Sequence, residues 1–171
     1  MKTCILVCLL ALTSAAFAQT DKKEKPLKEP NDIGVADFDL FKNTSFDILT
    51  NADKLKADTK RIDDAVKQYP TMTGLSIERI KGDYNALKRL KDETTELTNK
   101  IPELDNQGKQ LVENAKNVTP KLKSIDAVGN TKDSIKALDK AKASLNDTAT
   151  LLDANLKVVT DELKARGEKL D

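Results

Sequence analysis

Residues 131–166, TKDSIKALDKAKASLNDTATLLDANLKVVTDELKAR, hold the pattern that decides the fold class. Apolar or small side chains recur there at steps of three and four residues, the spacing of one face of an α-helix. Gly167 follows and can end the helix. Lys142 also falls on this face, where its methylenes can lie along the seam or Ala141 can take the space. The face comprises Ile135, Leu138, Lys142, Leu145, Ala149, Leu152, Leu156, Val159 and Leu163.

A second stretch with the same spacing runs from about residue 37 to residue 69. Pro70 ends it, because proline lacks a backbone N–H and clashes with the preceding turn, and Gly74 completes the turn. The pattern predicts a helix of about 50 Å, close to the length of about 54 Å expected for residues 131–166. Its apolar face comprises Phe38, Phe41, Ser45, Ile48, Ala52, Leu55, Thr59, Ile62, Val66 and Tyr69.

A third stretch begins at about residue 75 and continues to Val118. Pro102 lies inside it and predicts a kink or a brief break near Lys100. Beyond it, Pro120 and the pair Gly129-Asn130 indicate a connection, with residues 122–128 as a short helical turn and Asn130 as the N-cap of the last helix. The face of the third stretch comprises Ile77, Ile80, Tyr84, Leu87, Leu90, Thr94, Leu97, Ile101, Leu104, Gly108, Leu111, Ala115 and Val118.

Three long helices with short connections predict an all-α fold. We expect an elongated antiparallel three-helix bundle with coiled-coil-like packing over residues 37–171, with a four-helix bundle as the alternative. Many positions on the three faces are Ser, Thr or Ala, so each layer of the core is thin. The bundle is therefore expected to be only moderately stable.

The first 18 residues have the features of a secretory signal peptide: Lys2, a short apolar run, and Ala16-Phe17-Ala18 at the expected cleavage site. The apolar run is too short to cross a bilayer, which takes about 20 residues. Export implies a secreted protein, extracellular or, in a bacterium, periplasmic. Residues 19–36 are charged and contain Pro26, Pro30 and Gly34, a composition that predicts a flexible leader.

The composition argues against most catalytic chemistry. The chain has no His, and its two cysteines, Cys4 and Cys8, belong to the signal peptide. The usual general base, thiol nucleophile and zinc ligands are thus missing from the exported chain. Acidic pairs such as Asp63-Asp64 are expected on solvent faces, where no pKa is perturbed. We expect no enzyme, no metal and no cofactor.

The charge balance bears on the partners. The chain carries 29 Lys and Arg against 28 Asp and Glu, and loss of Lys2 with the signal leaves a net charge of zero. A nucleic-acid-binding protein is typically basic, so no nucleic acid is expected. No stretch after the signal is apolar enough to form a transmembrane span.

Three phenylalanines, Phe38, Phe41 and Phe46, form the one aromatic cluster of the exported chain. They are expected either to pack one end of the bundle or to form an exposed tip that contacts lipid or a partner. Asp37-Phe38-Asp39 can begin a calcium loop, but the remaining ligands of such a loop are missing, and helix capping explains these aspartates better.

Asparagines in the N-x-S/T pattern are sites of N-glycosylation if the source is a eukaryote. Asn43 and Asn146 fit this pattern, and Asn117 fits it less well because Pro120 follows directly after its threonine.

Ala65-Val66-Lys67-Gln68-Tyr69 before a Pro/Gly turn, followed by the regular spacing from Gly129 to Leu152, resembles the fungal hydrophobic surface-binding and cell-wall galactomannoprotein family. The resemblance covers roughly residues 45 to 160. It implies a signal peptide, one small helical domain and binding to hydrophobic surfaces or lipids at a cell wall. It implies no site residues.

Two functions follow as hypotheses. The first is a structural or protein-interaction role, with a protein partner or self-association, because a narrow 3-4 seam suits packing between helices. The second is binding to lipid or another hydrophobic surface by a bundle whose thin core costs little to open.

Overall fold

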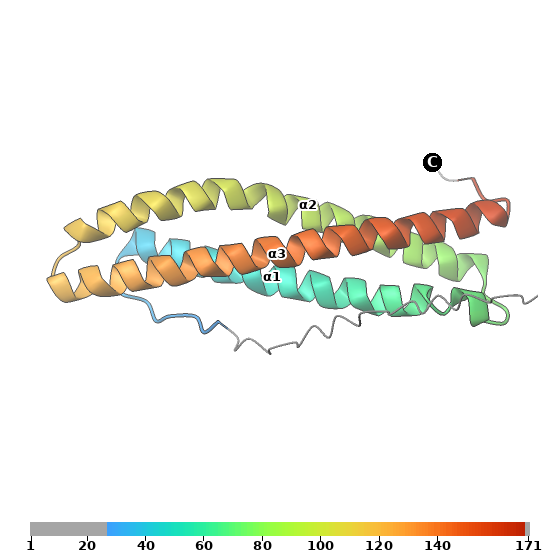
Figure 1. The fold of residues 1–171 in the computed structure, drawn as a ribbon, viewed down its shortest axis with the longest axis horizontal. Helices are drawn as coiled ribbons and strands as arrows, with labels where there is room; N and C mark the ends of the chain where they lie inside the picture. Colours follow the sequence, from blue (N-terminus) through green and yellow to red (C-terminus); the bar gives the residue numbers. More distant parts are fainter. Residues whose placement is uncertain (1–26, 170–171) are drawn as a thin grey trace, which may run out of the picture.

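The computed structural model describes residues 27–169, in which three long helices pack against each other and no strand occurs (Figure 1). The predicted signal peptide and residues 19–26 lie outside the described residues. Successive helices run in opposite directions, so the first and the third are parallel (Figure 1). The elements are α1 (Ala36–Val66), η1 (Tyr69–Thr71), α2 (Ile77–Asn114), η2 (Ala115–Asn117) and α3 (Lys121–Ala165).

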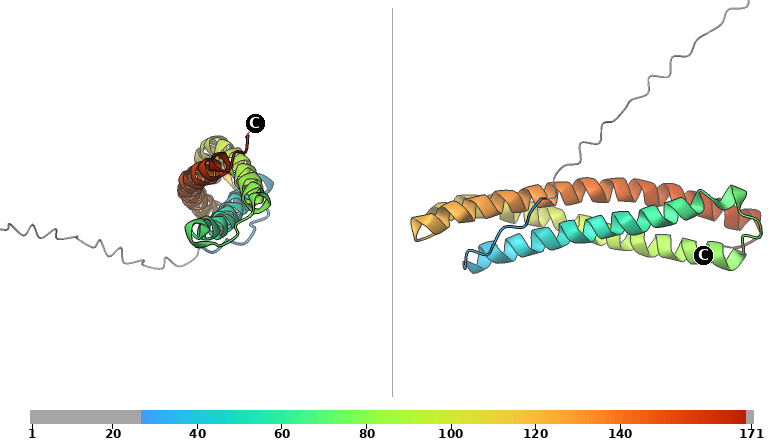
Figure 2. Two further views of the ribbon diagram at one scale, coloured as in Figure 1. Left: turned by 90° about the vertical axis from the view of Figure 1, so that its right-hand side faces the viewer. Right: turned by 90° about the horizontal axis from the view of Figure 1, so that it is seen from below.

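The core is formed by the faces that the spacing predicts. Every predicted position of α1 is buried, and those of α2 and the segment after it are buried or half-buried. In α3 the exception is Lys142, which is exposed, while Ala141 is fully buried in its place. Viewed along the long axis, the three helices surround a common centre (Figure 2). None of the described helices is long and apolar enough to span a membrane.

The third helix begins ten residues earlier than the sequence suggests. Pro120 precedes the first turn of α3, and Gly129 and Asn130 lie inside the helix. The prediction of a connection and an N-cap at residues 129–130 is therefore wrong. A glycine inside a helix costs about 1 kcal/mol, and burial of Ala127 and Thr131 against the core offsets that cost.

Pro102 lies inside α2, which continues through it without a break and curves along its length (Figure 1).

Residues 27–35, which we call the N-terminal strap, are held against the bundle by Lys42. Its side chain is only 5% exposed, and its Nζ lies 2.7 Å from Glu29 Oε1 and 2.8 Å from Asp32 Oδ1. The ammonium also donates to the carbonyl of Pro30 at 3.1 Å. Burial alone lowers the pKa of Lys42, but the hydrogen bonds and charges of these two carboxylates raise it above 10.5. The strap thus supplies the counter-charges that a buried lysine needs.

Two further contacts fix the strap. The carboxylate of Asp39 accepts hydrogen bonds from the backbone N–H groups of residues 33–35, at 2.8–3.1 Å, just before α1 begins. The Asn130 side chain donates to the carbonyl of Asn31 at 2.7 Å, and the strap crosses from the start of α1 toward α3 (Figure 2). Residues 27–35 of the predicted leader, which spans residues 19–36, thus make specific contacts with the helices, and its flexibility stays a prediction. Asp39 serves the start of the helix, as the capping interpretation has it.

Candidate functional site

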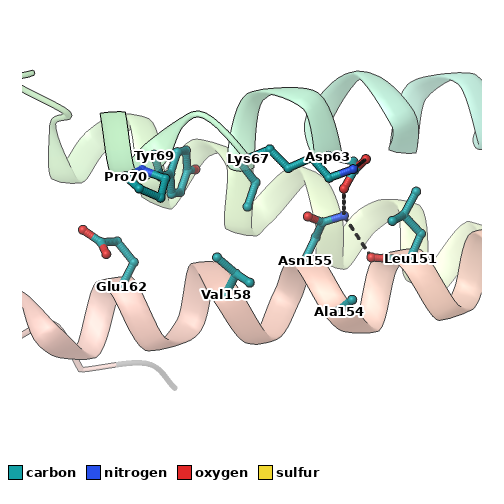
Figure 3. A pocket seen from close by; sticks show the side chains of 10 residues that line it. Asp63, Lys67, Tyr69, Pro70, Leu151, Ala154, Asn155, Val158 and Glu162 are labelled. Atoms are coloured by element: carbon teal, nitrogen blue, oxygen red, sulfur yellow. Dashed lines mark hydrogen bonds and ion pairs between the residues drawn. The ribbon is translucent and has the colours of Figure 1, made fainter. Parts of the chain in front are cut away.

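A groove of about 740 Å³ lies between the C-terminal halves of α1 and α3 (Figure 3). Most of its wall is apolar, and four of the residues that line it, Asp63, Lys67, Asn155 and Glu162, are polar or charged. Val158 lies in its wall and is 48% exposed. The groove is lined by Asp63, Val66, Lys67, Tyr69, Pro70, Leu151, Ala154, Asn155, Val158 and Glu162.

The groove is short because contacts between elements limit it at both ends. At one end Lys56 of α1 forms an ion pair of 3.5 Å with Asp147 of α3. Asp147 lies one turn before Leu151 on the same side of α3, so this ion pair crosses the line of the groove. At the other end stand the η1 turn, with Tyr69 and Pro70, and Glu162. The space thus suits a compact ligand better than a long helix.

A polar cluster around Asp63 occupies one part of the groove. The Asp63 residue is 3% exposed. Its Oδ2 lies 2.7 Å from Lys67 Nζ and 3.5 Å from Lys60 Nζ, and its Oδ1 accepts from Asn155 Nδ2 at 3.3 Å. The expectation that Asp63 lies on a solvent face is wrong. Asp63 follows the seam residue Ile62 on the side that turns toward α3, and α3 covers it.

The side-chain amide of Asn155 has its orientation fixed by its partners. Its Nδ2 donates both to Asp63 and to the backbone carbonyl of Leu151, at 3.3 and 2.9 Å. Both partners are acceptors, so the nitrogen must face them and Oδ1 must point away. Figure 3 shows this oxygen turned toward the groove. Among residues 27–169, none donates a hydrogen bond to it, although the Asn155 residue is only 4% exposed.

The environment of Asp63 keeps it charged. Burial on its own raises the pKa of this carboxyl, but hydrogen bonds from Lys67 and Asn155, with the positive charge of Lys67, hold the pKa below 3.8. A carboxyl with a lowered pKa in the folded state stabilises the fold above its unfolded-state pKa. That contribution is lost as the pH falls through the folded-state pKa.

This linkage gives a prediction for acid stability. Between about pH 7 and pH 2, we expect the free energy of unfolding of the wild-type protein to fall more than that of Asp63→Asn, with the difference developing below about pH 4. Urea titrations followed by circular dichroism at several pH values measure both. Because other carboxylates titrate equally in the two proteins, parallel curves would show that Asp63 contributes nothing to the acid transition.

Tyr69 is a fixed wall of the groove. Its hydroxyl donates to Asp83 Oδ2 at 2.8 Å, and Arg79 Nε donates to the same oxygen at 3.0 Å. Burial and the neighbouring carboxylate raise the pKa of Tyr69 well above its ordinary value of 10.0. The phenol therefore stays neutral, and its ring stands beside Pro70 in the groove wall (Figure 3).

The residues that the sequence singles out lie elsewhere. Phe38, Phe41 and Phe46 are 5%, 1% and 6% exposed and belong to the N-terminal part of α1, away from the groove. The alternative of an exposed phenylalanine tip is therefore wrong, and the packing alternative holds. Asn43 and Asn146 are both exposed on their helices, as is Asn117. Whether these asparagines carry glycans stays a prediction.

The polar groups of the groove suit hydrogen bonding to a ligand. Lys67 offers N–H donors, Asn155 offers an acceptor, and the remaining charges are paired. Glu162, for example, lies 2.7 Å from Arg166. Residues 27–169 contain no group of three or more His, Cys, Asp or Glu arranged to hold a metal ion. The expectation that the protein is not an enzyme stays a prediction.

The comparisons with known proteins give no match. No protein-family model, no curated protein and no solved structure matches this chain. The resemblance to the fungal surface-binding family therefore stays a prediction.

Proposed function

We propose that the protein is an exported, non-catalytic binding protein whose α1/α3 groove holds a small apolar or amphiphilic ligand. The observation that carries this proposal is the groove itself. Its volume of about 740 Å³ falls in the range of about 300–1,000 Å³ typical of ligand sites. Apolar walls with a few convergent polar groups are the usual composition of such sites.

The charges around the groove favour a ligand without net charge. Asp63 is neutralised by its two lysines, and Glu162 by Arg166. A charged ligand would be repelled by the like charge of one of these ion pairs. An apolar ligand instead removes from water the half-buried Leu151 and the exposed Val158, which gains about 25 cal/mol for each Å² of apolar surface buried.

This function is a narrower form of the lipid-binding hypothesis. The sequence suggests an amphipathic bundle that opens on a surface, whereas the groove would take a ligand while the three helices remain packed. Export rests on the signal peptide predicted for residues 1–18. It places the binding protein outside the cytoplasm, where apolar ligands need a carrier or a receptor.

Fluorescence of the neutral apolar dye N-phenyl-1-naphthylamine tests the proposal. With the exported protein we expect a blue-shifted, saturable signal that Val158→Lys reduces at least about tenfold in affinity, because the lysine places a charge in the apolar wall. Leu122→Lys is the matched control, since Leu122 is 71% exposed at the other end of α3. No saturable binding, or equal binding by both variants, would overturn the groove as the ligand site.

A second candidate function, the protein-interaction role, is favoured by the end of the molecule opposite the groove. Leu122 and Ile125 lie three residues apart on α3 and are 71% and 63% exposed, so they form one exposed apolar patch on the first turns of the helix. Sedimentation velocity of the same two variants tests self-association through this patch. A concentration-dependent dimer that Leu122→Lys abolishes and Val158→Lys retains would support it, and a monomer at all concentrations would count against self-association.

A further inference from the structure

We infer that the groove between α1 and α3 selects a neutral amphiphile with a carboxamide head group and an apolar tail. The inference rests on the proposed function and names the ligand class of the same site. Two observations carry it: the acceptor of Asn155 that faces the groove, and the ammonium of Lys67 on the other side of Asp63.

The acceptor, Asn155 Oδ1, is held in a fixed position. Asn155 Oδ1 belongs to a residue that is 4% exposed, and the bonds of Nδ2 to Asp63 and Leu151 prevent the amide from turning round. The oxygen itself is open to solvent, because the fully buried side-chain oxygens without a hydrogen-bond partner among the described residues are those of Thr59 and Ser144. A ligand that brings an N–H or O–H group to Asn155 Oδ1 replaces water there, for a net gain of about 0.5–1.5 kcal/mol.

The donor is Lys67. Its Nζ is engaged with Asp63 at 2.7 Å, and an ammonium group has three N–H donors. Its side chain is 64% exposed, so the other donors can turn to a ligand without loss of the ion pair. A head group at this point therefore meets an acceptor and a donor on either side of the Asp63 carboxylate.

A carboxamide carries the complementary group for each partner. Its N–H₂ donates to Asn155 Oδ1, and its C=O accepts from Lys67 Nζ. A carboxylate would accept from Lys67 but would be repelled by Asp63 and by the oxygen of Asn155. An ammonium would donate to Asn155 but would be repelled by Lys67. An ester offers an acceptor and no donor, so it leaves Asn155 unsatisfied.

The apolar tail has a defined course. From the head-group position it runs past Val158 and beside the ring of Tyr69 toward Glu162 (Figure 3). Asn155 and Glu162 are seven residues apart on α3, a distance of about 10 Å along a helix. A straight chain of medium length matches this distance, and a longer chain would extend past the η1 turn into water.

Isothermal titration calorimetry with four compounds of one tail length tests the inference: decanamide, methyl decanoate, decanoate and decylamine. We expect decanamide to bind about tenfold more tightly than each of the others, since each lacks one hydrogen bond or adds a repulsion. Val158→Lys is expected to remove the binding of all four compounds, because it blocks the tail.

Variants of the two head-group residues complete the test. Lys67→Met is expected to weaken decanamide about tenfold, and Asn155→Leu to abolish the preference for decanamide over methyl decanoate. Lys157→Met is the control, since Lys157 is 78% exposed and bound to Asp161 at 2.7 Å. Circular dichroism establishes that each variant keeps its helices.

The outcomes separate the two proposals. Equal affinities for the four head groups, with binding still lost in Val158→Lys, would overturn the carboxamide inference and leave the groove as an apolar ligand site. Absence of binding for every compound, together with absence of dye binding, would overturn the proposed function itself. A preference for decanamide that survives both head-group substitutions would overturn the assignment to Lys67 and Asn155.

Discussion

Replacement of Phe41 by alanine is expected to lower the free energy of unfolding by about 3–5 kcal/mol, the range for a fully buried aromatic residue. Phe41 is 1% exposed. Its ring lies opposite Gly108 of α2 and close to Ile135 of α3, so it fills space where all three helices meet. The thin layers elsewhere in the core provide few large side chains that could close the cavity. Urea unfolding followed by circular dichroism measures the loss.

The neighbouring Leu40 provides the control. It lies on the same turn of α1 but is 63% exposed, and Leu40→Ala is expected to change stability by no more than about 0.5 kcal/mol. A similar small effect in Phe41→Ala would mean that the phenylalanine does not pack the bundle. Such a result would favour the exposed-tip interpretation over the packing interpretation.

Gly108→Ala is expected to have the second large effect. The direction of the change in stability is informative, because alanine usually stabilises a helix relative to glycine. A Cβ atom at Gly108 would come within 2.7 Å of Phe41 Cζ and 3.0 Å of Ile135 Cγ1. Both side chains are held by the core, so the clash costs about 1–3 kcal/mol and outweighs the helix-propensity gain of about 1 kcal/mol. The net expected result is a loss of stability, measured in the same urea titration.

At two other helical glycines, replacement by alanine is expected to raise stability instead. A Cβ atom at Gly82 or Gly129 meets no atom within 4 Å, so Gly82→Ala and Gly129→Ala are each expected to stabilise the protein by about 0.5–1 kcal/mol. In the Phe41→Ala background, Gly108→Ala is expected to lose its penalty, because the two residues share one space. Additive effects of the two substitutions would contradict the close contact.

The sequence predicts the helices well because their periodicity is long and regular. The alternation of three and four residues from Phe38 to Tyr69 identifies every buried apolar position of α1 except Phe46. It also places Ala141 as the residue that can replace Lys142 on the seam. Such assignments depend only on which face of a helix is apolar, and that information is local.

The misassigned parts depend on contacts between distant segments. Gly129 and Asn130 have the local signature of a helix start, and packing of α3 against its neighbours overrides it. The charged composition of the strap favours disorder on its own. Ion pairs between Lys42 and two of its carboxylates hold the strap against the bundle. Local composition cannot reveal either contact.

The sequence does not predict the groove, again because it depends on contacts between distant segments. Asp63 and Asn155 are far apart in the sequence, and their encounter depends on the register of α1 against α3. The one available signal was Asn155 itself, an amide among apolar neighbours in the residue 151–159 segment. A buried polar residue at such a position often fixes the register of packed helices.

The parallel pairing of α1 with α3 determines the order in which the molecule can fold. Its cross-links, such as Lys56 with Asp147 and Asp63 with Asn155, join the first helix to the last. A growing chain that ends before residue 147 can form neither of these two contacts, and the second half of α1 still lacks its partner on α3. Contacts of such long sequence separation slow folding relative to local hairpins. This half of the molecule therefore closes only after the second half of α3 has been made, a delay that would suit the export proposed above.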